Sequence, residues 1–528
     1  MTRANTTSSG PLVELSAVEL RRLIGSKAIS PVELLDACIE RIEAVNPLIN
    51  AVTATCFDRA RTEAQAAERA VLAGEPLGLL HGLPLGVKDL EPTAGLLTTW
   101  GSPIYRDHVP SEDIELVARL RRAGAIVAGK TNVPEMGAGA NSRNPVWGAT
   151  GNPFDNNLNA GGSSGGSAAA LASDMLPVCT GSDTGGSLRI PAAKCGVVGF
   201  RPSPGVVPSV RKLLGWTPIS VVGPMGRTVE DACLQLAASA GMHAGDPLSY
   251  PLDALSFLTP ARTDLSRLRV AWTDDFGVCA VDQGIRTTFR NKIKAMRHLF
   301  ARCDEVQFDL GDAHRCFDVL RAESFVAGMQ AAYERDPASL GPNPRANYEM
   351  GARMSLLDSA WAQAEQTRLI HRFQETFAEY DLVLSPTTPV SPFPWTQPHA
   401  DTINGEQQAN YYRWLALTYV VTLTTHPALS LPCGTDHAGM PFGLQVVGGF
   451  RRDHEVLGAA HAMEQAFAGH AELRRPRPDL SRLRPAVPAL HSIVTAPPVF
   501  DARQAGSSTV SVVLSLIHIS EPTRQAEI

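Results

Sequence analysis

Short apolar segments alternate with helix-forming segments along this chain from about residue 79 onward. We expect strands at 82–88, 125–128, 176–180, 268–272, 382–384, 428–431 and 442–447, with helices at 113–123 and 165–172. Strands that are apolar along their whole length are typical of a sheet whose two faces are both covered by helices. The alternation therefore predicts an α/β protein built on a mixed or parallel sheet.

The N-terminal part of the chain is expected to be helical. Ser16 is followed by Glu19 and Ser30 by Glu33, and a serine with a glutamate three positions later is a capping box that starts a helix. A third helix is expected at about 57–72, which is rich in alanine, glutamate and arginine. None of these helices carries evident chemistry, so we interpret them as a structural layer.

Composition and charge exclude several classes of protein. The chain has 528 residues, of which 44% are hydrophobic, and its formal net charge is −6, so it offers a large core but no basic footprint for nucleic acid or an anionic membrane. Its nine cysteines include no Cys-x-x-Cys pair, and no stretch has the roughly 18 apolar residues of a membrane helix. The N-terminus lacks an apolar signal. We therefore expect a soluble, cytoplasmic protein with reduced thiols.

We expect one domain with terminal extensions. The sequence has no internal repeat, and its best boundary is the proline- and arginine-rich stretch at 474–488. The expected divisions are a disordered N-terminus at 1–11, a main domain at 12–480 and a C-terminal tail at 481–513. Residues 514–528 read LSLIHISEPTRQAEI, which resembles a translated adapter from a DNA sequencing library and is left out of the fold prediction.

Two clusters of glycine and serine carry the strongest chemical signal. They read GGSSGGS at 161–167 and GSDTGGSLR at 181–189. A nucleophilic serine has to lie where backbone N–H groups converge, because negative charge develops on the carbonyl oxygen under attack. Consecutive glycines supply such groups and let the backbone approach a substrate. The second cluster, with Ser187, therefore predicts cleavage of an amide or an ester.

A serine nucleophile also needs a base. No histidine lies near either cluster, although sequence distance does not exclude a Ser-His-Asp arrangement. Lys88 ends an expected apolar strand, and burial lowers the pKa of a lysine so that its neutral amine can accept a proton. The 14 histidines include no pair with metal-ligand spacing, so no metal is expected.

The motifs around these residues resemble those of the amidase signature family. Besides Lys88 and the two clusters, the similarity covers KTNVPE at 130–135, CGVVGFRPS at 195–203, GPMGRTVED at 223–231 and PFGLQVVG at 441–448. The matching motifs are closely spaced from about residue 79 to 231 and scattered from there to about residue 457. The resemblance implies a single α/β/α sandwich around a large mixed sheet flanked by helices. It also implies hydrolysis of a linear carboxylic amide to an acid and ammonia or an amine, without a cofactor or metal.

The same resemblance implies a Ser-Ser-Lys triad. Ser187 is expected to be the nucleophile that forms the acyl-enzyme, Ser163 the bridging hydroxyl in a cis peptide, and Lys88 the base. The spacing of the three residues suits the family without a gap.

The resemblance further implies the surroundings of the triad. The oxyanion hole is expected from the backbone amides of Thr184, Gly185, Gly186 and Ser187. The residues expected to support the site are Ser164, Asp183 and Arg189, and those expected to border the substrate are Met136 and Gly137.

Some residues depart from the family's pattern or have no assigned role. Lys194 stands where an apolar residue is usual, which bears on local packing, and Thr425 with His426 replaces a turn of small residues at the expected pocket wall. Five aromatic residues are candidates for the pocket, with core packing as the alternative: Trp216, Phe325, Tyr411, Tyr412 and Trp414.

Other patterns in the sequence suggest different activities, but their context does not fit. The P-loop-like string at 124–131 has its strand between the two glycines, and the Gly-x-Ser-x-Gly strings at 161–166 lack the apolar strand that an esterase elbow needs. Within the family, the alternative is the glutaminase-like A subunit of a tRNA-dependent amidotransferase, which passes ammonia to a partner. A catalytically inactive scaffold is the third. The expected partner is a small-molecule amide, with no nucleic acid and no membrane, and a homodimer is also allowed.

Overall fold

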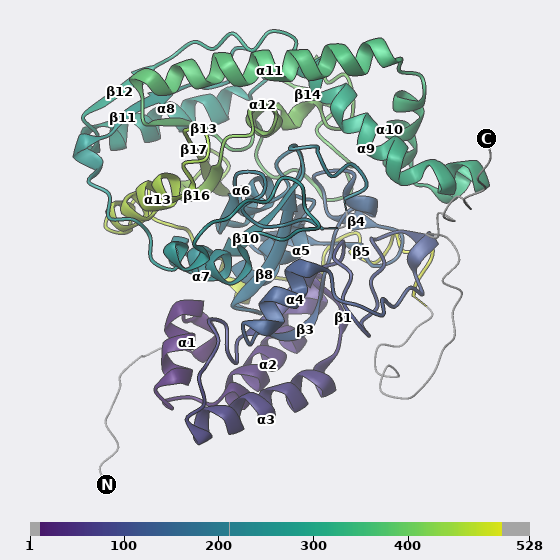
Figure 1. Ribbon diagram of the computed structural model, residues 1–528, viewed down its shortest axis with the longest axis vertical. Coiled ribbons are helices and arrows are strands. Elements are labelled where there is room, and N and C mark those ends of the chain that lie inside the picture. Colours follow the sequence, from purple (N-terminus) through teal and green to yellow (C-terminus); the bar gives the residue numbers. More distant parts are fainter. Residues whose placement is uncertain (1–10, 211, 499–528) are drawn as a thin grey trace, which may run out of the picture.

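An eleven-stranded sheet runs through the computed structural model, which describes residues 11–210 and 212–498. Helices flank the sheet on both sides (Figure 1). The expected α/β class with a large mixed sheet is confirmed. In order across the sheet, the strands are β1 (Val52–Thr55), β3 (Ile126–Thr131), β2 (Pro84–Lys88), β8 (Val178–Asp183), β10 (Val221–Gly226), β9 (Val198–Arg201), β16 (Ala428–Thr435), β17 (Pro441–Gly448), β13 (Leu382–Pro386), β11 (Arg269–Trp272) and β12 (Arg302–Glu305).

Strand pairing in this sheet is mixed. β2 pairs in parallel with β3 and β8, and β11 pairs in parallel with β12 and β13. The pairs β8–β10 and β16–β17 are antiparallel. Since parallel strands end at the same edge of a sheet, the end of β2 at Lys88 lies beside the end of β8 at Asp183.

The helices differ little from their expected bounds where the sequence predicted them. The segment expected at 113–123 is helical over Glu115–Arg122, and 165–172 is helical as expected. The helices are α1 (Ala17–Gly25), α2 (Pro31–Ile49), α3 (Phe57–Ala73), α4 (Glu115–Arg122), α5 (Gly165–Ala172), α6 (Arg189–Cys195), α7 (Val229–Ser239), α8 (Gln283–Met296), α9 (Ala313–Arg335), α10 (Pro342–Ala352), α11 (Leu356–Glu379), α12 (Ala416–Thr424) and α13 (Asp453–Ala468).

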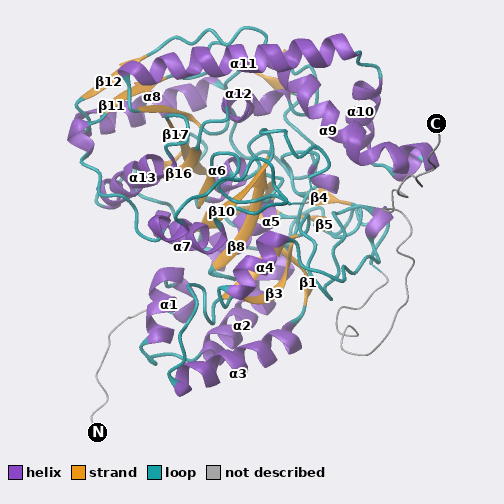
Figure 2. Ribbon diagram, in the orientation of Figure 1, coloured by secondary structure: helices purple, strands orange, loops and turns teal. Residues whose placement is uncertain are grey.

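Loops occupy much of the space between the sheet and the outer helices (Figure 2). They hold three two-stranded ribbons, which pair β4 (Arg143–Asn144) with β5 (Gly148–Ala149), β6 (Gly151–Asn152) with β7 (Asp155–Asn159), and β14 (Thr402–Ile403) with β15 (Glu406–Gln407). Helices α1–α3 gather at one end of the molecule, and α9–α11 lie at the other (Figure 1).

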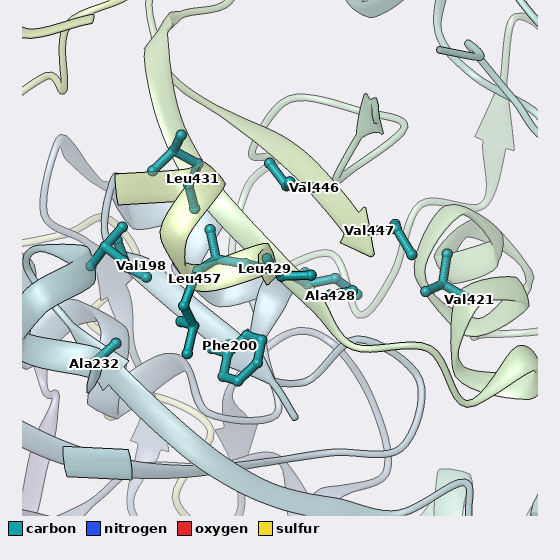
Figure 3. Packing of buried hydrophobic residues seen from close by; sticks show 14 of the residues in the cluster. Val198, Phe200, Ala232, Val421, Ala428, Leu429, Leu431, Val446, Val447 and Leu457 are labelled. Atoms are coloured by element: carbon teal, nitrogen blue, oxygen red, sulfur yellow. The ribbon is translucent and has the colours of Figure 1, made fainter. Parts of the chain in front are cut away.

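Aliphatic side chains from the middle strands form the centre of the core. Figure 3 shows Phe200 of β9 and Leu429 of β16 beside Leu457 of α13. All three side chains are buried, as are Val198 and Val446 on the neighbouring strands. Burying such side chains contributes about 1.5–3 kcal/mol each relative to leaving them exposed, so this layer holds the two halves of the sheet together.

Helix α5 packs unusually closely because it consists of small residues. Every residue from Gly165 to Ala172 is buried. A Cβ atom on Gly166 would lie 2.1 Å from the backbone nitrogen of Asn132, so only glycine fits there. The close approach brings the turn before α5, with Ser163 and Ser164, down onto the ends of β2 and β8.

The described part of the expected tail packs on the main domain. The backbone N–H of Ala149 donates to the carbonyl of Leu490 at 2.9 Å, and Leu490 is buried in a small cluster with Ala486 and Trp395. The division at 480 stays a prediction. The adapter-like segment 514–528 lies outside the described residues, as do 1–10 of the expected N-terminal extension.

None of the helices within 11–210 and 212–498 is long and apolar enough to cross a membrane. All nine cysteines are free thiols, and seven of them are buried, from Cys38 to Cys433.

Candidate active site

Three segments far apart in the sequence meet at the end of β2. They are Lys88 on β2, the turn with Ser163 and Ser164 before α5, and the connection from β8 to α6 that contains Ser187. The backbone N–H of Ser164 donates to the carbonyl of Ser187 at 3.3 Å, which joins the two serine turns directly. The fold therefore brings both glycine–serine clusters to the lysine.

The side chain of Lys88 is completely buried, and its amine contacts three serine hydroxyl groups. Its Nζ atom lies 2.9 Å from Ser163 Oγ, 2.7 Å from Ser164 Oγ and 2.9 Å from Ser182 Oγ. An ammonium group donates to all three. A neutral amine donates two hydrogen bonds and accepts the third, so its lone pair can take a serine proton.

Burial also sets the charge of this amine. It lowers the pKa of Lys88 from the usual range of about 10.4 to about 7, while the carboxylates of Glu91 and Asp183 act in the opposite direction. Desolvation outweighs the attraction of the two carboxylates. A substantial neutral fraction of Lys88 is thus present near neutral pH.

Ser163 and Ser187 differ in access to solvent. Ser163 is 3% exposed and follows a cis peptide bond at Gly162–Ser163, whereas Ser187 is half-buried. Of the two hydroxyls, that of Ser187 is the one an incoming molecule can reach, and that of Ser163 lies beside the amine of Lys88.

A buried ion pair supports the turn after β8. The carboxylate of Asp183 accepts hydrogen bonds from the backbone N–H groups of Gly186 at 2.9 Å and Leu188 at 3.2 Å. It also accepts two from Arg189, at 3.0 and 2.9 Å, while Arg201 donates to the Asp183 carbonyl at 2.7 Å. The two guanidinium groups and these hydrogen bonds hold the pKa of Asp183 far below its usual range.

The turn that contains Gly185 and Gly186 is fixed from outside by α12. Thr418 Oγ1 donates to the Gly185 carbonyl at 2.6 Å. The φ angle of Gly186 is +117°, and a Cβ added there would lie 2.2 Å from Thr418 Oγ1. The Gly186 amide is already bonded to Asp183. Outside regular secondary structure, the amides of Thr184, Gly185 and Ser187 donate no hydrogen bond to another described residue.

Gly137 lies beside Ser163 at the end of the short turn Glu135–Gly137, directly after Met136, and a substrate-bordering role for the two residues stays a prediction. Both have positive φ angles, +52° for Met136 and +70° for Gly137. A Cβ on Gly137 would lie 3.6 Å from Ser163 Oγ. Absence of a side chain at Gly137 thus keeps the space over Ser163 open.

Sequence reasoning missed residues that complete the surroundings of Lys88. The backbone N–H of Lys88 donates to Thr180 Oγ1 at 2.8 Å, and Thr180 donates to the buried carboxylate of Glu91. Thr180 and Ser182 are two positions apart on β8, so they face the same side of the sheet as the Lys88 side chain. Hydroxyl side chains at every second position of this strand are the sequence pattern that could have identified Thr180 and Ser182.

The two departures from the family's pattern are accommodated by packing. The buried amine of Lys194 donates to Asn159 Oδ1 at 3.0 Å and lies over the rings of Phe393 and Trp414, at 4.3 and 4.9 Å from their centroids. His426 is buried against α11, stacked on Phe377 at 5.1 Å. Burial lowers the pKa of His426 to about 4, so its imidazole is neutral at pH 7.

No cluster of histidine, cysteine, aspartate or glutamate within the described parts of the chain has the grouping needed to hold a metal ion. The polar groups around the Lys88 amine are the hydroxyls of Ser163, Ser164 and Ser182 and the carboxylates of Glu91 and Asp183.

The chain belongs to the amidase family, whose pattern matches residues 33–457. It is similar to an acylamidase of Rhodococcus erythropolis, with 34% identity over 461 residues that cover 85% of this chain and 95% of the acylamidase. It is also similar to the A subunit of the glutamyl-tRNA(Gln) amidotransferase from Acaryochloris marina, with 32% identity over 471 residues covering 84% of this chain and 96% of that protein.

The fold matches that of a crystal structure of a bacterial aryl acylamidase of the amidase signature family. The TM-score is 0.81 at 30% identity, and the match covers 87% of this chain and 97% of the acylamidase. The expected family is therefore confirmed by both sequence and fold.

Proposed function

We propose that this chain is an amidase that hydrolyses a linear carboxylic amide through an acyl-enzyme on Ser187. The observation that carries the proposal is the fully buried amine of Lys88, 2.9 Å from Ser163 Oγ and joined through the serine turns to Ser187. A buried neutral amine, a bridging hydroxyl and an accessible hydroxyl are the parts that a proton relay to a nucleophile needs.

In the first half of the reaction, Ser187 is acylated. Ser163 passes its proton to Lys88 and takes the proton of Ser187, whose Oγ forms a bond to the amide carbon. The π electrons of the carbonyl move to its oxygen. When this intermediate collapses, the C–N bond breaks and the leaving nitrogen takes the proton back from Lys88 through Ser163.

In the second half, water replaces the amine. It attacks the ester carbonyl of the acyl-enzyme while Ser163 and Lys88 take its proton. The bond from the carbon to Ser187 Oγ then breaks, and the proton returns to Ser187. The acid leaves and Lys88 is neutral again, so one amide and one water give one acid and one amine or ammonia.

Backbone amides of the turn between β8 and α6 are proposed to stabilise the negative oxygen. Those of Thr184, Gly185 and Ser187 are the best candidates, because the Gly186 amide donates to Asp183. The Asp183–Arg189 pair and the Thr418 contact hold this turn rigid. Donors that are fixed before the reaction need no reorganisation when charge develops.

The relatives favour a second candidate within the same family. Similarity to amidotransferase A subunits, at 32% identity, is nearly as high as similarity to the acylamidase. In that alternative, the same site would release ammonia from an amide for a partner protein. Intact candidate catalytic residues, together with the relay at Lys88, weigh against an inactive scaffold.

The deciding experiment measures ammonia and amine release from a panel of aliphatic, aryl and amino-acid amides by the purified chain alone. We expect turnover of at least one substrate class and its loss in Ser187→Ala. No turnover by the chain alone, with turnover restored by co-purified partner proteins, would support the amidotransferase alternative. Size-exclusion chromatography of the same sample tests whether the chain forms a homodimer.

A further inference from the structure

Arg321, on α9, is buried without a carboxylate partner. The residue is 6% exposed, and no aspartate or glutamate lies within ion-pair distance of it in residues 11–210 and 212–498. Its Nε donates to Asn347 Oδ1 at 3.1 Å and its Nη2 to the Tyr411 hydroxyl at 2.7 Å. Neither acceptor is a carboxylate, and the nearby Asp318 carboxylate, one turn earlier on α9, pairs with Arg413 instead.

Other buried arginines of this protein form ion pairs with aspartate. Arg189 and Arg201 pair with Asp183, and Arg227 pairs with Asp174. A buried charge without an opposite charge is costly, which is why buried arginines are normally paired. Arg321 departs from this rule, and its place in the fold explains the departure.

Aromatic rings surround the guanidinium group of Arg321. Its Cζ atom lies 4.9 Å from the ring centroid of Phe325, 5.0 Å from that of Tyr412 and 5.9 Å from that of Phe317. Such rings attract a cation and exclude water at the same time. They also leave the guanidinium in surroundings of low dielectric, where an anion that reaches it binds strongly.

The residues around Arg321 touch both walls of the candidate active site. One helical turn before it, Phe317 lies against Gly185, since a Cβ on Gly185 would be 3.2 Å from Phe317 Cζ. On the other side, Asn347 shares α10 with Asn343, which donates to the Ala138 carbonyl at 2.8 Å, next to Gly137. Arg321 thus lies between the turn at Gly185 and the turn at Gly137.

Part of the guanidinium remains available to a ligand. Within the described residues, Nη1 donates no hydrogen bond, and it is not among the polar atoms that are sealed from solvent without a partner. A guanidinium is a planar fork of N–H donors that matches the two oxygens of a carboxylate.

We infer that Arg321 binds a carboxylate on the substrate, so that the site prefers amides that carry a negative charge away from the bond that is cleaved. The inference rests on the proposed function and narrows it to a class of substrate. The carboxylate can belong to either side of the amide: to the acyl part, as in the monoamide of a dicarboxylic acid, or to the amine part, as in an N-acyl amino acid.

Matched substrate pairs test this with the wild-type chain. The monoamides of glutaric and adipic acid are compared with pentanamide and hexanamide, which place a methyl group where the acids have a carboxylate. N-acyl amino acids are compared with the corresponding N-acyl alkylamines. We expect kcat/KM to favour the charged member of one pair type by at least tenfold, and the pair type that shows it identifies the side of the amide.

Variants assign the preference to Arg321. We expect Arg321→Met to reduce kcat/KM for the charged substrate by on the order of 100-fold, mainly through KM, and that for the neutral partner by less than threefold. Arg321→Lys should be intermediate, because it keeps the charge without the fork. Arg315→Met, on the same helix but exposed and paired with Asp358, is the matched control and should change neither.

The outcomes separate the two proposals. Equal kcat/KM for charged and neutral amides in the wild type would overturn the role of Arg321 and leave the amidase intact. The same holds if Arg321→Met slows both substrates equally while remaining folded by circular dichroism. Absence of turnover on every amide, together with absence of covalent labelling at Ser187, would overturn the proposed function itself.

Discussion

Lys88 Nζ and Ser163 Oγ lie 2.9 Å apart, although 75 positions separate the two residues in the sequence. The amine comes from the end of a fully buried strand and the hydroxyl from a glycine-rich turn. A serine hydroxyl beside a desolvated amine can lose its proton near neutral pH, which the same serine in water cannot do. This pair is the basis for the predictions about catalysis.

The first prediction identifies the nucleophile. Ser187→Ala should abolish covalent labelling by a fluorophosphonate probe, because the accessible hydroxyl that attacks phosphorus is gone. Ser164→Ala should still be labelled, though more slowly, since it loses hydrogen bonds to Lys88 and to the Ser182 backbone but keeps the Ser187 hydroxyl. Intact-protein mass spectrometry measures both. Labelling that persists in Ser187→Ala and disappears in Ser164→Ala would point to an esterase-like elbow instead.

The second prediction concerns the pH dependence of Lys88. Its pKa is lowered to about 7 by burial, and only the neutral amine can act as the base. We expect kcat/KM to be low below this pKa, to rise as pH increases through about 7 and to level off at alkaline pH. Steady-state kinetics from pH 5 to 10 on a neutral amide measure the profile, and a flat profile would contradict the assignment.

Substitution of Lys88 tests the same role independently. Lys88→Ala should lower kcat on the order of 10³-fold or more, because both the base and the relay through Ser163 are lost. Lys88→Arg should be nearly as inactive, since a guanidinium stays charged at any usable pH. Circular dichroism serves as the folding control. A folded Lys88→Arg chain with more than about a tenth of wild-type activity would exclude Lys88 as the base.

The third prediction concerns the buried pair of Asp183 and Arg189. Arg189→Met should lower the free energy of unfolding by about 3–5 kcal/mol, because it removes one partner of a fully buried ion pair. The exposed pair of Glu19 and Arg22 provides the control, and Glu19→Gln should leave the urea midpoint unchanged within error. Equal effects of the two substitutions would show that the buried pair does not stabilise the turn.

The stability that Asp183 contributes should also depend on pH. Its pKa is depressed in the folded protein, so the unfolded chain binds the proton more readily. The contribution is therefore present above the unfolded pKa of about 4 and declines as pH falls below it. Urea unfolding of wild type and Asp183→Asn at pH 7, 5 and 3 should show a difference that is largest at pH 7 and 5.

The fourth prediction concerns Gly137. Gly137→Ala should reduce kcat/KM by about tenfold or more, because the new methyl group would lie 2.8 Å from Leu90 Cδ1 and 3.6 Å from Ser163 Oγ. Gly439→Ala is the matched control: its φ of +76° is similar, but no atom lies within 4 Å of the added Cβ. It should carry backbone strain alone and leave kcat/KM within about twofold. Similar losses in both variants would show that backbone strain, not crowding at Ser163, is responsible.

The fifth prediction concerns the C-terminus. Deletion of 514–528 should leave the melting temperature and activity unchanged, since this segment resembles adapter sequence. Deletion from residue 483 onward should lower the melting temperature by about 3 °C or more, because Leu483, Ala486 and Leu490 are buried. Differential scanning calorimetry distinguishes the two. A drop of several degrees in the shorter deletion would mean that the segment is part of the native protein.

The sequence predicted the parts of this protein that depend on local pattern. Short apolar runs predicted β2, β3 and β8, because strands buried on both faces are mainly apolar, and their polar residues gather at the strand ends. It did not predict the neighbouring strands β9 and β10, which carry glycine, proline and arginine and are stabilised by pairing with the rest of the sheet. Nor did it predict α9–α11, whose buried faces are defined by contact with one another.

For the candidate site, the sequence by itself determined which residue types were available: Lys88 at a strand end and serines among glycines, whose roles followed from family resemblance. Only the tertiary structure decided that Ser182, Thr180 and Glu91 surround Lys88, and that Arg321 lies between Gly185 and Gly137. These contacts depend on the pairing of β2 with β8 and on the docking of α9 and α10. These contacts join residues that are far apart in the chain. They stabilise the protein only once long loops have been closed at a cost in entropy, so a local sequence pattern does not predict them.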